Sequence, residues 1–306
     1  QYNVCSMPPP SSGGVHLLQI LNTIGSTDLA AMGWHSPDSL HLLIESMRIA
    51  YADRSKYLGD PDFIKVPVSA LTNPAYAAQR RQEIKLDRAR SSTNLQPVAP
   101  EILKQFDAPA KQPVGAPTST NKGYSHAQIT NNKQPLSESL ETSHLTIVDQ
   151  DRNVVSLTFT VNYRFGAGVV VPGTGILLND EMDDFAAASM TSTIVTENGQ
   201  FRLAAGAPGG STIITTVLQI LLNVLEYKMD VGAAVSAGKI HHQWLPDKVN
   251  VDPWGFDPST LAELGRRGHL IEPREYWSNA NAIGQLPDGR LEGAADPRGE
   301  GVAQGF

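Results

Sequence analysis

The chain takes on an extended pattern at residues 141–160, which read ETSHLTIVDQDRNVVSLTFT. Apolar residues alternate with polar ones at residues 145–147 and again from Val155 to Phe159. The polar run 150–153 lies between these two segments and favours a turn. The pattern therefore predicts a β-hairpin.

Further strands and one long helix are predicted after this hairpin. Asn198-Gly199 and Asp288-Gly289 favour tight turns between strands. A helix is predicted to begin after Pro208-Gly209-Gly210-Ser211, because apolar residues then recur at helical spacing. The predicted short strands are 169–171, 176–178, 193–195 and 201–204.

The chain before the hairpin divides into two parts. Residues 1–90 have a helical pattern, with a helix start at Ser36-Pro37, where a capping hydroxyl precedes a proline in the first turn. Residues 91–141 hold six prolines and few apolar residues, so we expect them to form mostly a mobile linker. A third region, residues 142–306, follows this linker.

Charge and cysteine content exclude several classes of protein. The 306 residues hold 24 basic and 31 acidic side chains, and the net charge of -7 argues against binding to nucleic acid or to an anionic membrane. Cys5 is the single cysteine, which excludes an intrachain disulfide and a cysteine-rich metal cluster. The most apolar stretch, 213–225, is shorter than the ~20 residues that cross a bilayer.

Thr142 lies where the expected linker meets a strand, a position that suits an autoprocessing N-terminal nucleophile. Cleavage before Thr142 would free an α-amine with a pKa of about 8, which could act as the base for the hydroxyl of the same residue. The position also suits an ordinary threonine at the start of a strand. The pattern by itself leaves both interpretations open.

Gly209 and Gly210 precede the predicted long helix. Amide N–H groups and the helix dipole at such a position favour an oxyanion or a carboxylate. The alternative is a tight turn that needs glycine for its dihedral angles.

Two other clusters carry weaker signals. The acidic run 180–184 could hold an amine or a cation, although acidic clusters are usually solvated loops. His241 and His242 could suggest a metal site, but adjacent side chains on a strand point to opposite faces, which favours a structural role.

Several strings of residues together resemble the γ-glutamyltranspeptidase family and follow the order of that family. The resemblance covers nearly everything except the expected linker. It corresponds to the later part of a full-length member, namely the end of the large subunit followed by the small subunit. The matching strings are 6–14 (SMPPPSSGG), 51–54 (YADR), 57–63 (YLGDPDF), 71–73 (LTN), 142–144 (TSH), 175–179 (GILLN), 182–185 (MDDF), 208–211 (PGGS), 241–247 (HHQWLPD) and 296–298 (DPR).

The resemblance implies an α+β fold, the four-layer αββα sandwich of the N-terminal nucleophile (Ntn) hydrolases. The precursor would cut itself between Glu141 and Thr142 and form a heterodimer of a large and a small subunit. Thr142 would attack the γ-amide of glutathione or another γ-glutamyl compound, and the resulting ester would pass its γ-glutamyl group to water or to an acceptor amino acid or peptide. No cofactor and no metal are implied. Bacterial members are mostly periplasmic or secreted, so the same location is expected here.

The resemblance also implies roles for individual residues. Thr160 would hydrogen-bond and orient the nucleophile, while Gly209 and Gly210 would form the oxyanion hole. The residues expected to hold the amino-acid head of the glutamyl group are Asn162, Glu181 and Asp184, whose acids would pair with its ammonium group.

The sequence departs from the family pattern at three points. The loop after Phe185 is short, so that only Ser189 matches a Ser-Ser pair that contacts the substrate α-carboxylate. Either the site is open, without the family's lid, or residues are missing from this numbering. Ala237-Gly238-Lys239 stands where the family usually has a Pro-Arg pair. The arginine that binds the α-carboxylate belongs to the upstream region and has no counterpart here.

Two other functions are considered beside this one. The first is a related acylase acting on glutaryl or cephalosporin amides. Glu181 and Asp184 argue against it, because an acyl group without an α-ammonium would give these acids no group to pair with. The second is a non-catalytic fragment that binds a ligand or a partner chain. An evolved pseudoenzyme is disfavoured by the presence of Thr142, Thr160 and the glycine pair.

Overall fold

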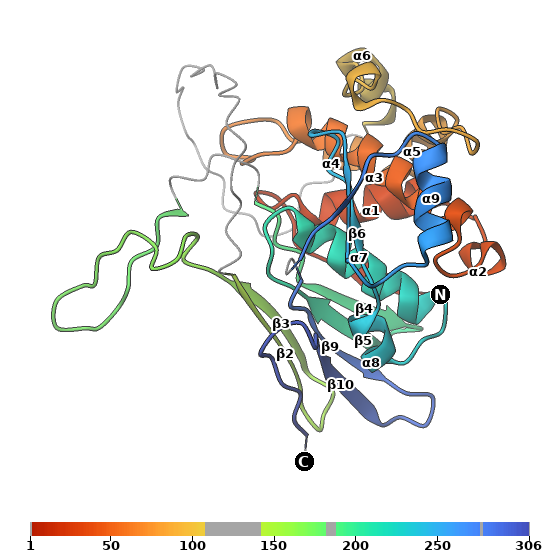
Figure 1. Cartoon of the computed structure of the whole chain (residues 1–306). Coiled ribbons are helices and arrows are strands. Elements are labelled where there is room, and N and C mark those ends of the chain that lie inside the picture. The colour runs from red at the N-terminus through yellow and green to blue at the C-terminus, as the bar shows by residue number, and fades with distance from the viewer. Residues whose placement is uncertain (1, 108–141, 182–187, 276–277, 306) are drawn as a thin grey trace.

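A five-stranded antiparallel sheet lies between a layer of helices and a two-stranded ribbon (Figure 1). The computed structural model describes residues 2–107, 142–181, 188–275 and 278–305. Helices α7 and α8 contact the sheet, α1 contacts α7, and α3 contacts α1. The ribbon β2–β3 contacts the opposite face of the sheet.

The strands form three sheets, of five, two and three strands. The five-stranded sheet has the order β1 (Tyr2–Cys5), β4 (Thr193–Glu197), β5 (Gln200–Gly206), β9 (Asn281–Gln285) and β10 (Leu291–Ala295). The ribbon consists of β2 (Ser143–Val148) and β3 (Val154–Phe159). The third sheet contains β6 (Ile240–His241), β7 (Val249–Val251) and β8 (Ile271–Pro273).

The helices are concentrated before residue 107 and between residues 212 and 266. None of those in the described ranges is both long and apolar enough to cross a membrane. The first group comprises α1 (Gly13–Ile24), α2 (Leu29–Met32), α3 (Pro37–Tyr57), α4 (Val68–Leu71), α5 (Pro74–Arg81), η1 (Ser92–Asn94), α6 (Pro100–Leu103) and η2 (Lys104–Phe106). The second comprises α7 (Thr212–Leu225), α8 (Val231–Ser236) and α9 (Pro258–Arg266).

The predicted hairpin is confirmed as β2–β3, an antiparallel pair in which Ser143 lies opposite Phe159 and Val148 opposite Val154. Extending this register by one residue places Thr142 opposite Thr160. Opposite residues of such a pair have Cα atoms only about 4.5–5.5 Å apart. The hairpin therefore brings the two threonines to the same end of the ribbon.

The ribbon turns its polar face toward the five-stranded sheet. His144 and Thr158 are buried on this face, and Asn281 of β9 donates to the His144 carbonyl at 3.0 Å. The outer face carries apolar side chains that are about half exposed, namely Ile147, Val155, Leu157 and Phe159. Of the predicted four-layer sandwich, the described residues thus supply one helical layer and the two β layers, in an α+β arrangement.

The His144 ring lies directly against Gly206, the last residue of β5. A Cβ atom built on Gly206 would be 2.2–2.6 Å from three atoms of that ring, closer than any real contact. Only glycine fits here, because the ring occupies the space that a side chain would need.

The predicted long helix is confirmed as α7, whose fourteen residues are all buried between the sheet and α1. The predicted turns are also confirmed, with positive φ angles at Asn198, Gly199 and Gly289. Helix α3 begins as predicted, since the Ser36 hydroxyl accepts from the Ser39 amide.

Other features differ from the sequence-based expectations. Strand β1 lies in a segment expected to be helical, where it pairs with β4. The predicted strands 169–171 and 176–178 are reduced to a single bridge between Val170 and Leu177, and both flanking segments are largely exposed. Residues 92–106, within the proline-rich stretch, form η1, α6 and η2, with Leu95 and Leu103 buried.

The contact between Gly206 and His144 predicts that Gly206→Ala destabilises the protein by about 1–3 kcal/mol, because the ring must move away from the sheet. The shift of the urea unfolding midpoint measures this loss. Gly265→Ala is the matched control, since a Cβ atom there meets nothing within 4 Å. We expect it to leave the midpoint unchanged or slightly raised. Equal midpoints for the two variants would contradict the role given to Gly206.

Candidate active site

Thr142 directly precedes strand β2 of the ribbon and is half-buried. Because side chains alternate along a strand, Thr142 shares the inward face of the ribbon with His144, two residues away. His144 contacts Gly206, and Gly209 follows three residues later. The contact between His144 and Gly206 therefore lies two residues from the candidate nucleophile and three residues from the glycine pair.

Thr160 and Asn162 are linked to each other at the same end of the ribbon. The Asn162 amide donates to Thr160 Oγ1 at 2.9 Å, and Asn162 is buried with a positive φ of 71°. A threonine hydroxyl that accepts this bond still has its own proton to donate. Thr160 can direct that proton toward the position opposite, which Thr142 occupies.

His144 connects the ribbon to the start of β4. Its Nδ1 atom lies 2.8 Å from Thr158 Oγ1, which lies 2.7 Å from Ser192 Oγ. Burial lowers the pKa of His144 to about 4, so the ring is neutral at neutral pH. The histidine of the TSH string acts here as a neutral hydrogen-bonding group, a role that the sequence did not assign.

Gly209 and Gly210 have φ angles of 128° and 58°, values that favour glycine. Their carbonyls accept from the first amides of α7. Neither glycine donates its own amide to any of the described residues. The pair thus presents two amide donors at the positive end of a fourteen-residue helix, as stabilisation of an oxyanion requires.

Tyr51 of α3 supports this glycine turn from the helical side. Its buried hydroxyl donates to the Ser211 carbonyl at 2.6 Å, directly after Gly210. Ser211 Oγ in turn donates to Gln243 Oε1 at 2.7 Å. Two side chains distant in sequence therefore hold the turn in place.

The segment that contains Ser189 is held by the start of α1. Ser12 donates to the Ala188 carbonyl from both its amide and its hydroxyl, each at 2.7 Å, and Ser11 Oγ donates to the Met190 carbonyl at 2.7 Å. A Cβ atom on Gly13 would lie 2.1 Å from the same Met190 oxygen. The SSGG string thus provides the hydroxyls and the space that this segment needs.

The acidic residues are only partly described. Glu181 is half-buried, and its amide donates to Asn179 Oδ1 at 3.0 Å. Its neighbour Asp180 accepts from the Asn162 side chain at 3.4 Å through its carbonyl, which brings the acidic run to the Thr160 end of the ribbon. Asp184 and Glu141 lie outside the described residues.

His241 and His242 make separate contacts in the interior. His241 Nδ1 lies 2.9 Å from Thr215 Oγ1 and its Nε2 2.8 Å from Gln243 Oε1, and burial lowers its pKa to about 3. His242 Nε2 lies 3.3 Å from Asp247 Oδ1. Within the described ranges, no three His, Cys, Asp or Glu side chains come together as a metal site would require.

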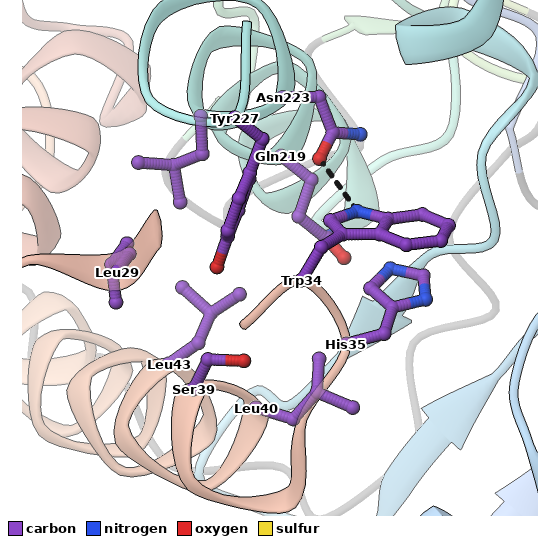
Figure 2. Close-up of a pocket in the computed structure, with 10 residues that line it drawn as sticks. Leu29, Trp34, His35, Ser39, Leu40, Leu43, Gln219, Asn223 and Tyr227 are labelled. Carbon is purple, nitrogen blue, oxygen red and sulfur yellow. Dashed lines mark hydrogen bonds between the residues drawn. The ribbon is translucent and has the colours of Figure 1, made fainter. Parts of the chain in front are cut away.

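Two cavities in the described part of the chain lie away from these residues. One of about 20 Å³, the size of a single water molecule, lies between α2, α3 and α7 (Figure 2). Trp34 Nε1 donates to Asn223 Oδ1 at its edge, at 3.2 Å. A wider groove of about 330 Å³ lies beside Trp254 and Arg298. Neither is lined by any predicted site residue.

Comparison with known proteins identifies the family. The profile of the family Gamma-glutamyltranspeptidase matches residues 1–306. The chain belongs to the γ-glutamyltranspeptidase family. It is 39% identical over 322 residues to the glutathione hydrolase proenzyme of Escherichia coli strain K12, covering 97% of this chain and 50% of that protein. The chain therefore spans about half the length of this relative.

Acylases are also among the similar proteins. The chain is 33% identical to the acylase ACY 1 proenzyme of Pseudomonas sp. strain V22, over 98% of this chain and 50% of that protein. The crystal structure of a cephalosporin acylase from Bacillus halodurans superposes with a TM-score of 0.76 at 24% identity, covering 100% of this chain and 52% of that one. The predicted α+β fold of the Ntn-hydrolase type is confirmed.

The buried His144 predicts that acid destabilises the protein. Its pKa is about 4 in the folded state against 6.5 when unfolded, so its stabilising contribution is complete above pH 6.5 and is lost as the pH falls toward 4. This loss amounts to about 3 kcal/mol. We expect urea midpoints to decline with pH over this range and to decline less steeply for His144→Gln. Identical slopes for the two proteins would contradict a neutral, buried His144.

Proposed function

We propose that this chain carries the catalytic centre of a glutathione hydrolase and γ-glutamyltransferase with Thr142 as its nucleophile. The observation that carries the proposal is the register of β2–β3, which makes Thr160 the neighbour of Thr142 while His144 anchors the ribbon on Gly206. The names of the glutathione hydrolase relatives support the choice of substrate.

The reaction uses the groups in the following order. The free α-amine of Thr142 takes the proton of its own hydroxyl, and Oγ1 attacks the γ-carbonyl carbon of the donor. The Gly209 and Gly210 amides stabilise the oxyanion of the tetrahedral intermediate. The donor amine leaves with a proton, and water or the amine of an acceptor amino acid or peptide then cleaves the γ-glutamyl ester.

The amino-acid head of the donor has an ammonium group and a carboxylate, and each is bound by protein groups of complementary charge or hydrogen-bonding character. Glu181 and Asp184 pair with the ammonium group, Asn162 hydrogen-bonds to the head, and Ser189 donates to the α-carboxylate. The position of Asn162 beside Thr160, and its bond to the Asp180 carbonyl, support this placement.

Maturation requires cleavage between Glu141 and Thr142. Residues 1–90 and the proline-rich segment 91–141 would then belong to the large subunit, and residues 142–306 would form the small subunit. A periplasmic or secreted location stays a prediction from the family resemblance.

An acylase function is the second candidate, because ACY 1 proenzymes are also similar to this chain. A glutaryl group has the carboxylate of a γ-glutamyl group but lacks its α-ammonium. A glutaryl donor would therefore give the two acids no ammonium group to pair with, which favours the γ-glutamyl donor.

Turnover of two anilides by the protein at its natural length tests this assignment. We expect L-γ-glutamyl-4-nitroanilide to exceed glutaryl-4-nitroanilide in kcat/KM by about 10- to 100-fold, because only the first has an ammonium group for the acids. Thr142→Ala should lower turnover by roughly a thousandfold or more, since it removes the nucleophile. A preference for the glutaryl anilide would favour the acylase, and activity retained by Thr142→Ala would contradict both candidates.

A further inference from the structure

Arg54, in the last turn of α3, connects Ser189 to the start of α1. Its Nη2 atom donates to Ser189 Oγ at 2.9 Å, and its Nε atom donates to Ser12 Oγ at 3.0 Å. Ser12 in turn donates to the carbonyl of Ala188, the residue before Ser189. The Arg54 guanidinium therefore binds the side chain of Ser189 and also the Ser12 hydroxyl, which binds the backbone next to Ser189.

The guanidinium is itself held in a defined position. It is half-buried, and its central carbon lies 5.7 Å from the centre of the Tyr51 ring, within the range of a cation–π contact. Tyr51 is one helical turn earlier in α3 and bonds to the Ser211 carbonyl beside the glycine pair. The same turn of α3 thus contacts both the proposed oxyanion hole and the Ser189 segment.

The direction of the Arg54–Ser189 hydrogen bond determines what Ser189 can do. A serine hydroxyl has one proton and two lone pairs, whereas a guanidinium can only donate. Arg54 therefore occupies a lone pair of Ser189 Oγ and leaves the hydroxyl proton for another partner. Because the donor is charged, the bond also polarises the hydroxyl and makes it a better donor.

We propose that Arg54 is a positioning residue that orients Ser189 as a hydrogen-bond donor to the α-carboxylate of the γ-glutamyl substrate. The inference rests on the proposed function and extends it to a residue of the YADR string, to which the sequence assigned no role. Arg54 acts through Ser189 and takes no part in bond making or breaking, so its loss affects substrate binding and leaves the chemical step intact.

The test compares two donors on the full-length protein. L-γ-glutamyl-4-nitroanilide has an α-carboxylate, and its α-carboxamide analogue keeps the ammonium group but lacks that charge. For Arg54→Gln we expect KM for the first donor to rise about tenfold or more with little change in kcat, and KM for the second to stay the same. Arg54→Lys should restore part of the affinity, because lysine keeps the charge but cannot donate in the same fork.

The ratio of kcat/KM for the two donors is the decisive quantity, because it does not depend on how much of a preparation is folded. Arg290→Gln is the control, since Arg290 is an exposed residue paired with Asp288, and its ratio should equal that of the wild type. A double-mutant cycle with Ser189→Ala adds a second measure. If Arg54 acts through Ser189, Arg54→Gln should have little further effect on KM in the Ser189→Ala background.

Each outcome distinguishes the inference from the function on which it rests. Wild-type protein that turns over neither donor would contradict the proposed function and the inference together. Normal wild-type turnover, with an Arg54→Gln variant that loses activity equally on both donors, would overturn the inference alone. Additive effects of Arg54→Gln and Ser189→Ala on KM would overturn it as well.

Discussion

The contact between the His144 ring and Gly206 is the constraint on which the candidate site depends. It anchors the ribbon on the sheet through a buried polar face, two residues from Thr142 and three from Gly209. Burial keeps the imidazole neutral, so the anchor consists of hydrogen bonds and close packing and involves no ion pair. A side chain at Gly206 would displace Thr142, the proposed nucleophile, together with the ribbon.

A second set of contacts joins three segments that are distant in the sequence. Ser12 at the N-cap of α1, Arg54 from α3 and Thr158 from the ribbon all bond to residues 188–192. Hydroxyl groups predominate in these contacts, and they satisfy the carbonyls of a segment that has no regular secondary structure. The segment that contains Ser189, proposed to bind the substrate head, is thereby coupled to the helical layer as well as to the sheet.

Local features of the fold could be predicted from the sequence because their causes are local. Ser36 caps α3, Asn198-Gly199 forms a turn, and alternating residues form the β2–β3 hairpin. The role of Arg54 could not be predicted, since its partner Ser189 is 135 residues away and no periodic pattern connects them. The inward orientation of the polar face of the ribbon could not be predicted either. Alternation in the sequence suggests that the apolar face is buried, yet in the described residues this face is half exposed.

The most direct test of the account is the amino-terminal sequence of the purified protein after denaturation. If the ribbon register, the glycine pair and His144 assemble a working nucleophile, a chain that begins Thr142-Ser143-His144 will be present, and it will be absent from Thr142→Ala. Wild-type protein that has no amino terminus at Thr142 would contradict the central claim that these residues form an autoprocessing active site.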